Sequence, residues 1–150
     1  MKNLPVILTA LLVLAADLAS KAYIMATMRP GDYFWVIPGV FRLAYVRNPG
    51  GAFGLLPNAK WLFLGVGFLV AIFVMWYGSR ARNPATRVAL GLVLGGAVGN
   101  MVDRWQTGKV VDFLDFRVWP VFNLADVAVV GGILLLIGLT LTGKEERPSE

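Results

Sequence analysis

The chain has 150 residues, 57% of them hydrophobic, and a net charge of +5, and it contains no cysteine and no histidine. These absences exclude disulfides and thiol nucleophiles, and they remove the usual ligand of a zinc site and the usual base of Ser-His catalysis. The basic residues are scattered, without a basic stripe interleaved with aromatics, so we expect lipid headgroups rather than nucleic acid as their partners.

Four apolar stretches approach or exceed the length of about 20 residues that a helix needs to cross a bilayer core. They cover residues 4–28, 61–77, 88–102 and 121–142. The sequence therefore predicts an all-α membrane protein with four transmembrane helices, forming one domain over residues 1–150. No internal repeat is visible.

The first stretch begins like a cleavable signal peptide, with Lys2 ahead of an apolar run. Its apolar character continues past Lys21, so we expect a retained transmembrane helix. Asp17 and Lys21 are spaced i, i+4 with the acid first, which favours an ion pair facing the interior of the bundle.

The segment from about residue 29 to 60 is expected outside the membrane, at its surface. Two stretches rich in aromatic and β-branched residues, 33–37 and 41–46, flank Pro38-Gly39. Because Pro then Gly suits the central positions of a type II turn, this pattern predicts a small extracytoplasmic β-hairpin. Asn48 follows it and opens a loop rich in proline and glycine.

The turn between the second and third stretches, residues 79–87, carries three arginines and no acid. Short loops rich in arginine stay on the cytoplasmic side, so we expect this turn and both termini to be cytoplasmic. The opposite ends of the helices then lie at the outer face.

The third stretch ends in a polar cluster of Asn100, Asp103 and Arg104, which share a helix face. Asp103 and Arg104 fit either a structural charge cluster or a recognition role, because arginine suits phosphate and carbonyl groups. Three small residues recur at every fourth position, at Gly91, Gly95 and Gly99. That spacing permits close helix contact.

Residues 110–119 are expected to form a second extended piece, and Pro120 suits the first turn of the last helix. In a strand, Asp112 and Asp115 face opposite ways. Asp112 shares its face with apolar residues, which raises a carboxyl pKa, whereas Asp115 shares its face with Arg117 as an expected solvated pair.

Asp126 lies in the last apolar stretch, where an ionised carboxylate costs a few kcal/mol and is by default a functional site. The alternative is a buried partner for a nearby arginine. Asn123 is three residues earlier on the same helical face and is placed to hydrogen-bond the site. If Asp112 and Asp126 meet, one keeps a proton while the other ionises, which is how an aspartic protease divides the work.

Five blocks in order resemble the lipoprotein signal peptidase family, also called signal peptidase II. They are residues 17–21 (DLASK), 48–54 (NPGGAFG), 99–104 (GNMVDR), 110–113 (VVDF) and 122–126 (FNLAD). The resemblance covers nearly the whole chain except the C-terminal tail. One departure is a short connection between residues 112 and 126, which implies that a flap or external helix of the family is reduced here.

The resemblance implies that Asp112 and Asp126 are the catalytic pair. It also implies that seven other residues support the site or bind substrate: Asp17, Lys21, Asn48, Asn100, Asp103, Arg104 and Asn123. The implied substrate is a bacterial prolipoprotein with a diacylglyceryl group on its lipobox cysteine, cut just before that cysteine at the outer face of the cytoplasmic membrane. We expect no metal or organic cofactor, a monomer, and inhibition by globomycin-type cyclic peptides.

The sequence also suggests two other functions. Intramembrane aspartyl proteases of the presenilin or prepilin-peptidase type carry a Gly-x-Gly-Asp block, which this sequence lacks. A small transporter or proton conductor would use Asp17, Lys21 and Asp126 as a relay. Transporters of this length usually need inverted repeats or oligomers.

Overall fold

The computed structural model describes residues 2–50, 56 and 58–143. Its elements in chain order are α1 (Leu4–Thr27), β1 (Tyr33–Ile37), β2 (Phe41–Asn48), α2 (Lys60–Gly78), α3 (Pro84–Thr107), β3 (Val110–Asp115) and α4 (Leu124–Leu141). All four helices are long and apolar enough to cross a membrane. Their outward side chains remain exposed, as for Leu12 at 73% in the middle of α1, which is expected of a surface that faces lipid.

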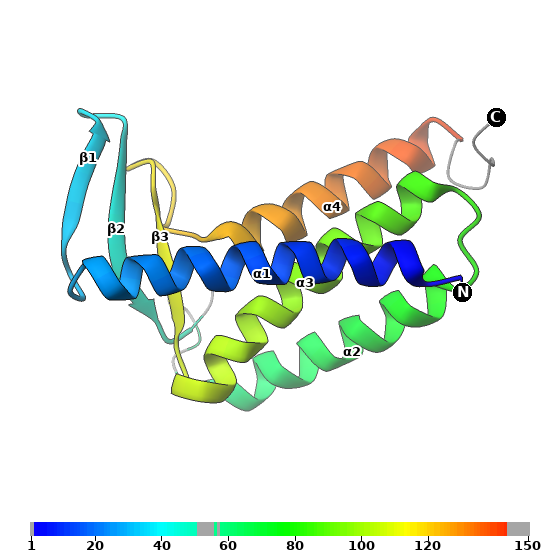
Figure 1. Ribbon diagram of the computed structural model, residues 1–150, viewed down its shortest axis with the longest axis horizontal. Coiled ribbons are helices and arrows are strands. Elements are labelled where there is room, and N and C mark those ends of the chain that lie inside the picture. The colour runs from blue at the N-terminus through cyan, green and yellow to red at the C-terminus, as the bar shows by residue number, and fades with distance from the viewer. Residues whose placement is uncertain (1, 51–55, 57, 144–150) are drawn as a thin grey trace.

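The four helices form one bundle with a small sheet at one end (Figure 1). Helix α3 contacts α1, α2 and α4, so it is the central helix of the bundle. The sheet lies at the end where α1 finishes and α4 begins, while the turn between α2 and α3 lies at the opposite end. Among the candidate site residues, Asn48 and Asp112 lie in the sheet, and Asn123 and Asp126 lie at the start of α4.

Glycines allow α3 to contact its neighbours closely, as their spacing predicted. A Cβ on Gly95 would lie 2.6 Å from the carbonyl oxygen of Ala10 in α1. On the side facing α4, a Cβ on Gly132 would lie 2.7 Å from the carbonyl oxygen of Ala89. Because these contacts are with backbone atoms, a side chain at either position would push the helices apart.

The predicted hairpin is present. Strands β1 and β2 pair antiparallel, and the amide N–H of Val40 donates to the carbonyl oxygen of Ile37 at 3.0 Å. Gly39 has a φ of 75°, which agrees with the third position of a type II turn. Strand β3 adds antiparallel to the other side of β2, giving the order β1-β2-β3.

Two helices do not begin where their apolar stretches begin. Helix α3 begins at Pro84 rather than residue 88, because the Asn83 side chain accepts the Ala85 N–H at 2.8 Å and proline occupies the first turn. Helix α4 begins at Leu124 rather than residue 121.

Pro120 therefore does not lie in the first turn of α4. Phe122 bridges to Leu114 of β3 instead, with its carbonyl oxygen accepting the Leu114 N–H at 2.8 Å. This extended backbone delays the helix until Asn123 can cap it.

Candidate active site

Asp112 lies in β3 with only 2% of its surface exposed. Its two carboxyl oxygens accept hydrogen bonds from two asparagine side chains. The Nδ2 of Asn48, at the end of β2, donates at 2.9 Å, and the Nδ2 of Asn123 donates at 2.7 Å. Antiparallel pairing of β2 with β3 brings Asn48 to this position.

Asp126 lies in the first turn of α4 and forms a capping box with Asn123. The Asp126 N–H donates to Oδ1 of Asn123 at 3.0 Å, and the Asn123 N–H donates back to Oδ2 of Asp126 at 3.2 Å. The second carboxyl oxygen, Oδ1, accepts from Nδ2 of Asn100 at 2.8 Å. A helix N-terminus favours a negative charge at this position.

Asn123 links the two acids, because its side-chain N–H binds Asp112 while its backbone N–H binds Asp126. Both acids line one cavity of about 230 Å³. Asn48, Asn100 and Arg104 line the same cavity. The Arg104 guanidinium lies 4.3 Å above the Phe63 ring and brings a positive charge to the wall of the cavity.

Burial raises the pKa of Asp112 to about 7 from its ordinary value of 3.8. The hydrogen bond from Asn48 opposes this shift, and the negative charge of Asp126 adds to it. A carboxyl with this pKa can hold or release a proton near neutral pH, which suits acid–base chemistry.

A buried ionic cluster lies beside the two acids. The Lys21 ammonium lies 2.7 Å from the Asp17 carboxylate and 2.9 Å from that of Asp103. The expected ion pair of Asp17 and Lys21 is thus present, with Asp103 as a second partner. Asp17 accepts the Ala125 N–H at 2.9 Å and Asp103 accepts the Val111 N–H at 3.0 Å, so the cluster ties α1 to α4 and α3 to β3.

The expectation for Asp115 was wrong. It is 4% exposed rather than solvated, and its partner is the guanidinium of Arg42 at 2.6 Å. Arg117 donates its backbone N–H at 2.8 Å, and its charge acts on Asp115 more weakly than that of Arg42. The register sets Arg42 opposite Asp115 across β2 and β3, which the sequence alone does not reveal.

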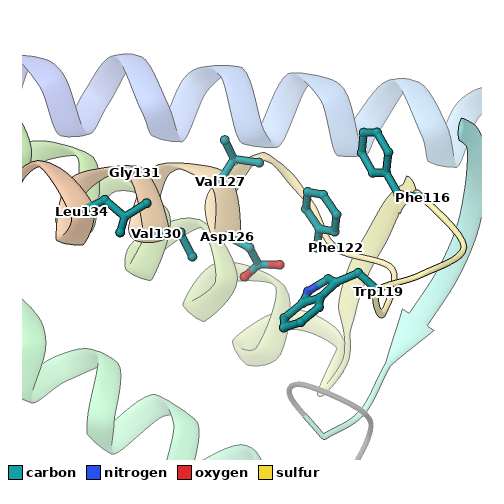
Figure 2. Close-up of a pocket in the computed structure, with 8 residues that line it drawn as sticks. All are labelled: Phe116, Trp119, Phe122, Asp126, Val127, Val130, Gly131 and Leu134. Atoms are coloured by element: carbon teal, nitrogen blue, oxygen red, sulfur yellow. The ribbon is translucent and has the colours of Figure 1, made fainter. Parts of the chain in front are cut away.

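A larger apolar cavity of about 600 Å³ opens beside Asp126 (Figure 2). Its residues come from the connection after β3 and from one face of α4: Phe116, Trp119, Phe122, Asp126, Val127, Val130, Gly131 and Leu134. A further cavity of about 300 Å³ reaches Asp126 from the side of α2 and includes Phe63 and Val66. Asp126 therefore lies where a polar cavity meets two apolar ones.

Sequence reasoning missed the lining of these apolar cavities. The available signal was the cluster of aromatic residues between β3 and α4, since Phe116, Trp119 and Phe122 fall within seven positions. Residues 116–123, all of which the structure describes, contain no helix. The aromatic side chains in this short connection form one wall of the larger cavity.

Comparisons with known proteins agree with the sequence blocks. A family model described as signal peptidase (SPase) II matches residues 9–142. Of the five sequence blocks, the structure describes the one at residues 48–54 only as far as residue 50, since residues 51–54 lie outside its described part. The lipoprotein signal peptidase of Moorella thermoacetica is 50% identical and aligns over 98% of this chain and 99% of its own. That of Pelotomaculum thermopropionicum is 47% identical over 89% of this chain and 90% of its own.

The fold matches as well. A bacterial membrane enzyme solved by the in meso method at 2.3 Å resolution superposes with a TM-score of 0.86 at 33% identity, covering 97% of this chain and 93% of its own. A second, solved at 1.9 Å resolution, gives a TM-score of 0.83 at 34% identity, over 91% of this chain and 92% of its own. A family match over most of the chain, relatives at about half identity and the same membrane fold establish that this chain belongs to the signal peptidase II family, a family of membrane proteases.

Proposed function

We propose that Asp112 and Asp126 are the catalytic pair of an aspartic endopeptidase. The observation that carries this proposal is their arrangement, because one acid from β3 and one from α4 line the same cavity. Asn123 donates its side-chain N–H to Asp112 and its backbone N–H to Asp126. The raised pKa of Asp112 supports it, because the pair needs one member that keeps its proton near neutral pH.

The proposed reaction is hydrolysis of a peptide bond by a water molecule held between the two acids. The ionised carboxylate takes a proton from the water as its oxygen attacks the carbonyl carbon. The neutral acid hydrogen-bonds the carbonyl oxygen and gives it a proton as the tetrahedral intermediate forms. Breakdown breaks the C–N bond, the departing amine takes a proton from the pair, and the carbonyl returns its proton.

Asn48, Asn100 and Asn123 are proposed to hold the two carboxyls in place, since each donates an N–H to one of them. Arg104 is proposed to bind substrate or to balance charge, because its side chain lines the cavity without a carboxylate partner among the described ion pairs. Asp17, Lys21 and Asp103 are proposed to support the site from the buried ionic cluster.

The proposed substrate is a prolipoprotein whose lipobox cysteine carries a diacylglyceryl group, cut just before that cysteine. Such a substrate presents its scissile bond beside two acyl chains. The site offers a matching environment, because the polar cavity around the acids adjoins apolar cavities of about 600 and 300 Å³. We further propose that cleavage takes place at the outer face of the cytoplasmic membrane, with both termini inside.

The same proposal extends to partners. We expect the chain to act as a monomer and a single domain within membrane lipids. Globomycin-type cyclic peptides are expected to inhibit cleavage by competing for the cavity that contains the two acids.

The decisive experiment uses purified protein and a lipidated precursor. Asp112→Asn and Asp126→Asn should each lower the cleavage rate by at least about 10³-fold, since one member of a catalytic unit cannot replace the other. Asp32→Asn is the matched control, because Asp32 is exposed and its carboxylate accepts the nearby backbone N–H of Arg29. Cleavage that persists in either dyad variant at near the parental rate would disprove the assignment.

A further inference from the structure

Three asparagines around the two acids have fixed orientations. An amide side chain has one end that accepts and one end that donates, and a neighbour that can only donate determines which end faces it. The Oδ1 of Asn48 accepts the Gly50 N–H at 3.0 Å, and the Oδ1 of Asn123 accepts the Asp126 N–H at 3.0 Å. Both amides therefore present their N–H groups to Asp112.

Asn100 is oriented by Lys21. The Lys21 ammonium, which has no acceptor, donates to Oδ1 of Asn100 at 3.1 Å, so the amide nitrogen faces Asp126 at 2.8 Å. The Nδ2 of Asn123 also donates to this oxygen at 3.1 Å. Its two hydrogens are shared among three acceptors, because the Val111 carbonyl oxygen and Oδ1 of Asp112 lie within reach as well. The strongest donor on Asn100 is thus the charged one, from α1.

We infer that Lys21 is a positioning residue that acts through Asn100 to keep Asp126 as the ionised member of the pair and leave the shared proton on Asp112. This inference rests on the proposed aspartic mechanism. It assigns roles within the pair: Asp126 deprotonates the water and Asp112 donates to the carbonyl oxygen.

The geometry explains why the orientation matters. If Asn100 turned over, its Oδ1 would face Asp126, repel the carboxylate and accept a hydrogen bond from the protonated acid. In the observed orientation both Asp126 oxygens receive N–H donors, from Asn100 and from the Asn123 backbone, at a helix N-terminus. Asp112 is the more deeply buried acid, and burial favours its neutral form.

Other charges face the pair from the elements packed around it. Arg104 of α3 lines the same cavity, while Asp17 of α1 and Asp103 of α3 offset the charge of Lys21. The charge of Lys21 is partly offset within its own cluster and still acts to lower the pKa of Asp112, but burial outweighs it and keeps that pKa raised. Its directed hydrogen bond to Asn100 is what reaches Asp126.

The test is a double-mutant cycle on cleavage of a lipidated precursor, measured from pH 4 to 9. Lys21→Met and Asn100→Leu should each lower kcat about 10²-fold with KM changed less than about 3-fold, as when one preorganised donor is lost. The acidic limb of the kcat profile should move to higher pH in both. Lys21→Met combined with Asn100→Leu should be no slower than Asn100→Leu alone.

Two controls keep the result interpretable. Lys60→Met removes a lysine that donates to the Trp105 carbonyl oxygen, outside the site, and should leave the pH profile unchanged. If Lys21→Met fails to fold because Asp17 and Asp103 lose their partner, Asn100→Leu keeps the ionic cluster intact and must still move the acidic limb.

Infrared spectroscopy provides a readout independent of turnover. At pH 6 the parent should show a protonated-carboxyl band that Asp112→Asn removes and Asp126→Asn does not. In Asn100→Leu, part of that band should survive the removal of Asp112, because Asp126 now takes up the proton. If the rate losses of Lys21→Met and Asn100→Leu multiply, or if the acidic limb stays in place, the inference is wrong. The catalytic pair itself is tested separately, by Asp112→Asn and Asp126→Asn.

Discussion

Two acids three residues apart in β3 are expected to respond to pH in opposite ways. Asp112 is buried among asparagine donors, and its pKa is raised to about 7, whereas Asp115 is buried against Arg42. Burial tends to raise the pKa of Asp115 as well, but the hydrogen bonds from the Arg42 side chain and the Arg117 backbone, together with the charges of both arginines, outweigh it and hold that pKa below the ordinary value. The same strand therefore contains one acid with a raised pKa and one with a lowered pKa.

For Asp112 the prediction concerns stability. A carboxyl whose pKa is higher in the folded than in the unfolded chain stabilises the fold at low pH, and that contribution is lost as pH rises from about 4 to about 7. Asparagine imitates the protonated acid at all pH values. The free energy of unfolding of Asp112→Asn minus that of the parent should therefore grow up to about pH 7 and then level off, with an upper bound of about 4 kcal/mol. The difference between the two melting temperatures should change with pH in the same way. A difference independent of pH would contradict the raised pKa.

For Asp115 the sign is reversed. A carboxyl whose folded pKa is depressed contributes stability above its unfolded pKa, and the contribution disappears as pH falls through the folded value. Asp115→Asn should cost about 1 kcal/mol at neutral pH, because the charge-assisted bond to Arg42 is lost. Thermal unfolding should show a deficit at pH 7 that becomes smaller as the pH is lowered below 4.

The sequence indicates which single residues lie in an apolar environment, but it does not indicate which partner a residue binds. An acid in an apolar span marked Asp126, and alternation in a strand marked Asp112. The partner of Asp115 could not be predicted, because the cross-strand register that sets Arg42 opposite it depends on how β2 and β3 pair in space. A hydrogen bond from Asn123 to the site was expected, but its bond to Asp112 could not be predicted, since it joins a strand to the N-cap of a helix.

At the scale of elements, hydropathy located the four helices but not their ends. Residues 121 and 122 are apolar whether they extend a strand or begin a helix, so an apolar run could not separate these cases. The better signal was Asn123, which caps α4 and also binds Asp112. A residue with both roles fixes where the helix starts and where its first acid points.

The contact between α1 and α3 should be sensitive to a single methyl group. A Cβ on Gly95 would lie 2.6 Å from a backbone oxygen and 2.7 Å from the Val13 Cβ, so the helices must separate. Gly95→Ala is expected to cost about 2 kcal/mol in thermal unfolding and to slow cleavage, because the same contact holds Lys21 against Asn100. Gly138→Ala in α4, where a Cβ meets nothing within 4 Å, is the matched control. Equal stability of the two variants would show that the helices do not depend on this contact.

The molecule as a whole has two different ends. The sheet lies at one end, and the turn between α2 and α3 lies at the other (Figure 1). The two acids belong to the sheet end, because Asp112 is in β3 and Asp126 is in the first turn of α4. At that turn the Arg80 guanidinium lies 4.3 Å above the Trp76 ring, an aromatic and a cation at the expected level of a membrane surface. The arginines of the turn predict that this end is cytoplasmic and that the acids face outward.

The absence of cysteine allows this orientation to be tested directly. Val40→Cys places a thiol in the exposed hairpin turn, and Pro84→Cys places one at the exposed start of α3 without removing an arginine. In intact cells a membrane-impermeant maleimide should label the first variant and reach the second only after permeabilisation. Both variants must first retain cleavage of a lipidated precursor. The reverse labelling would put the two acids on the cytoplasmic side, where a signal peptide being removed at the outer surface would never meet them.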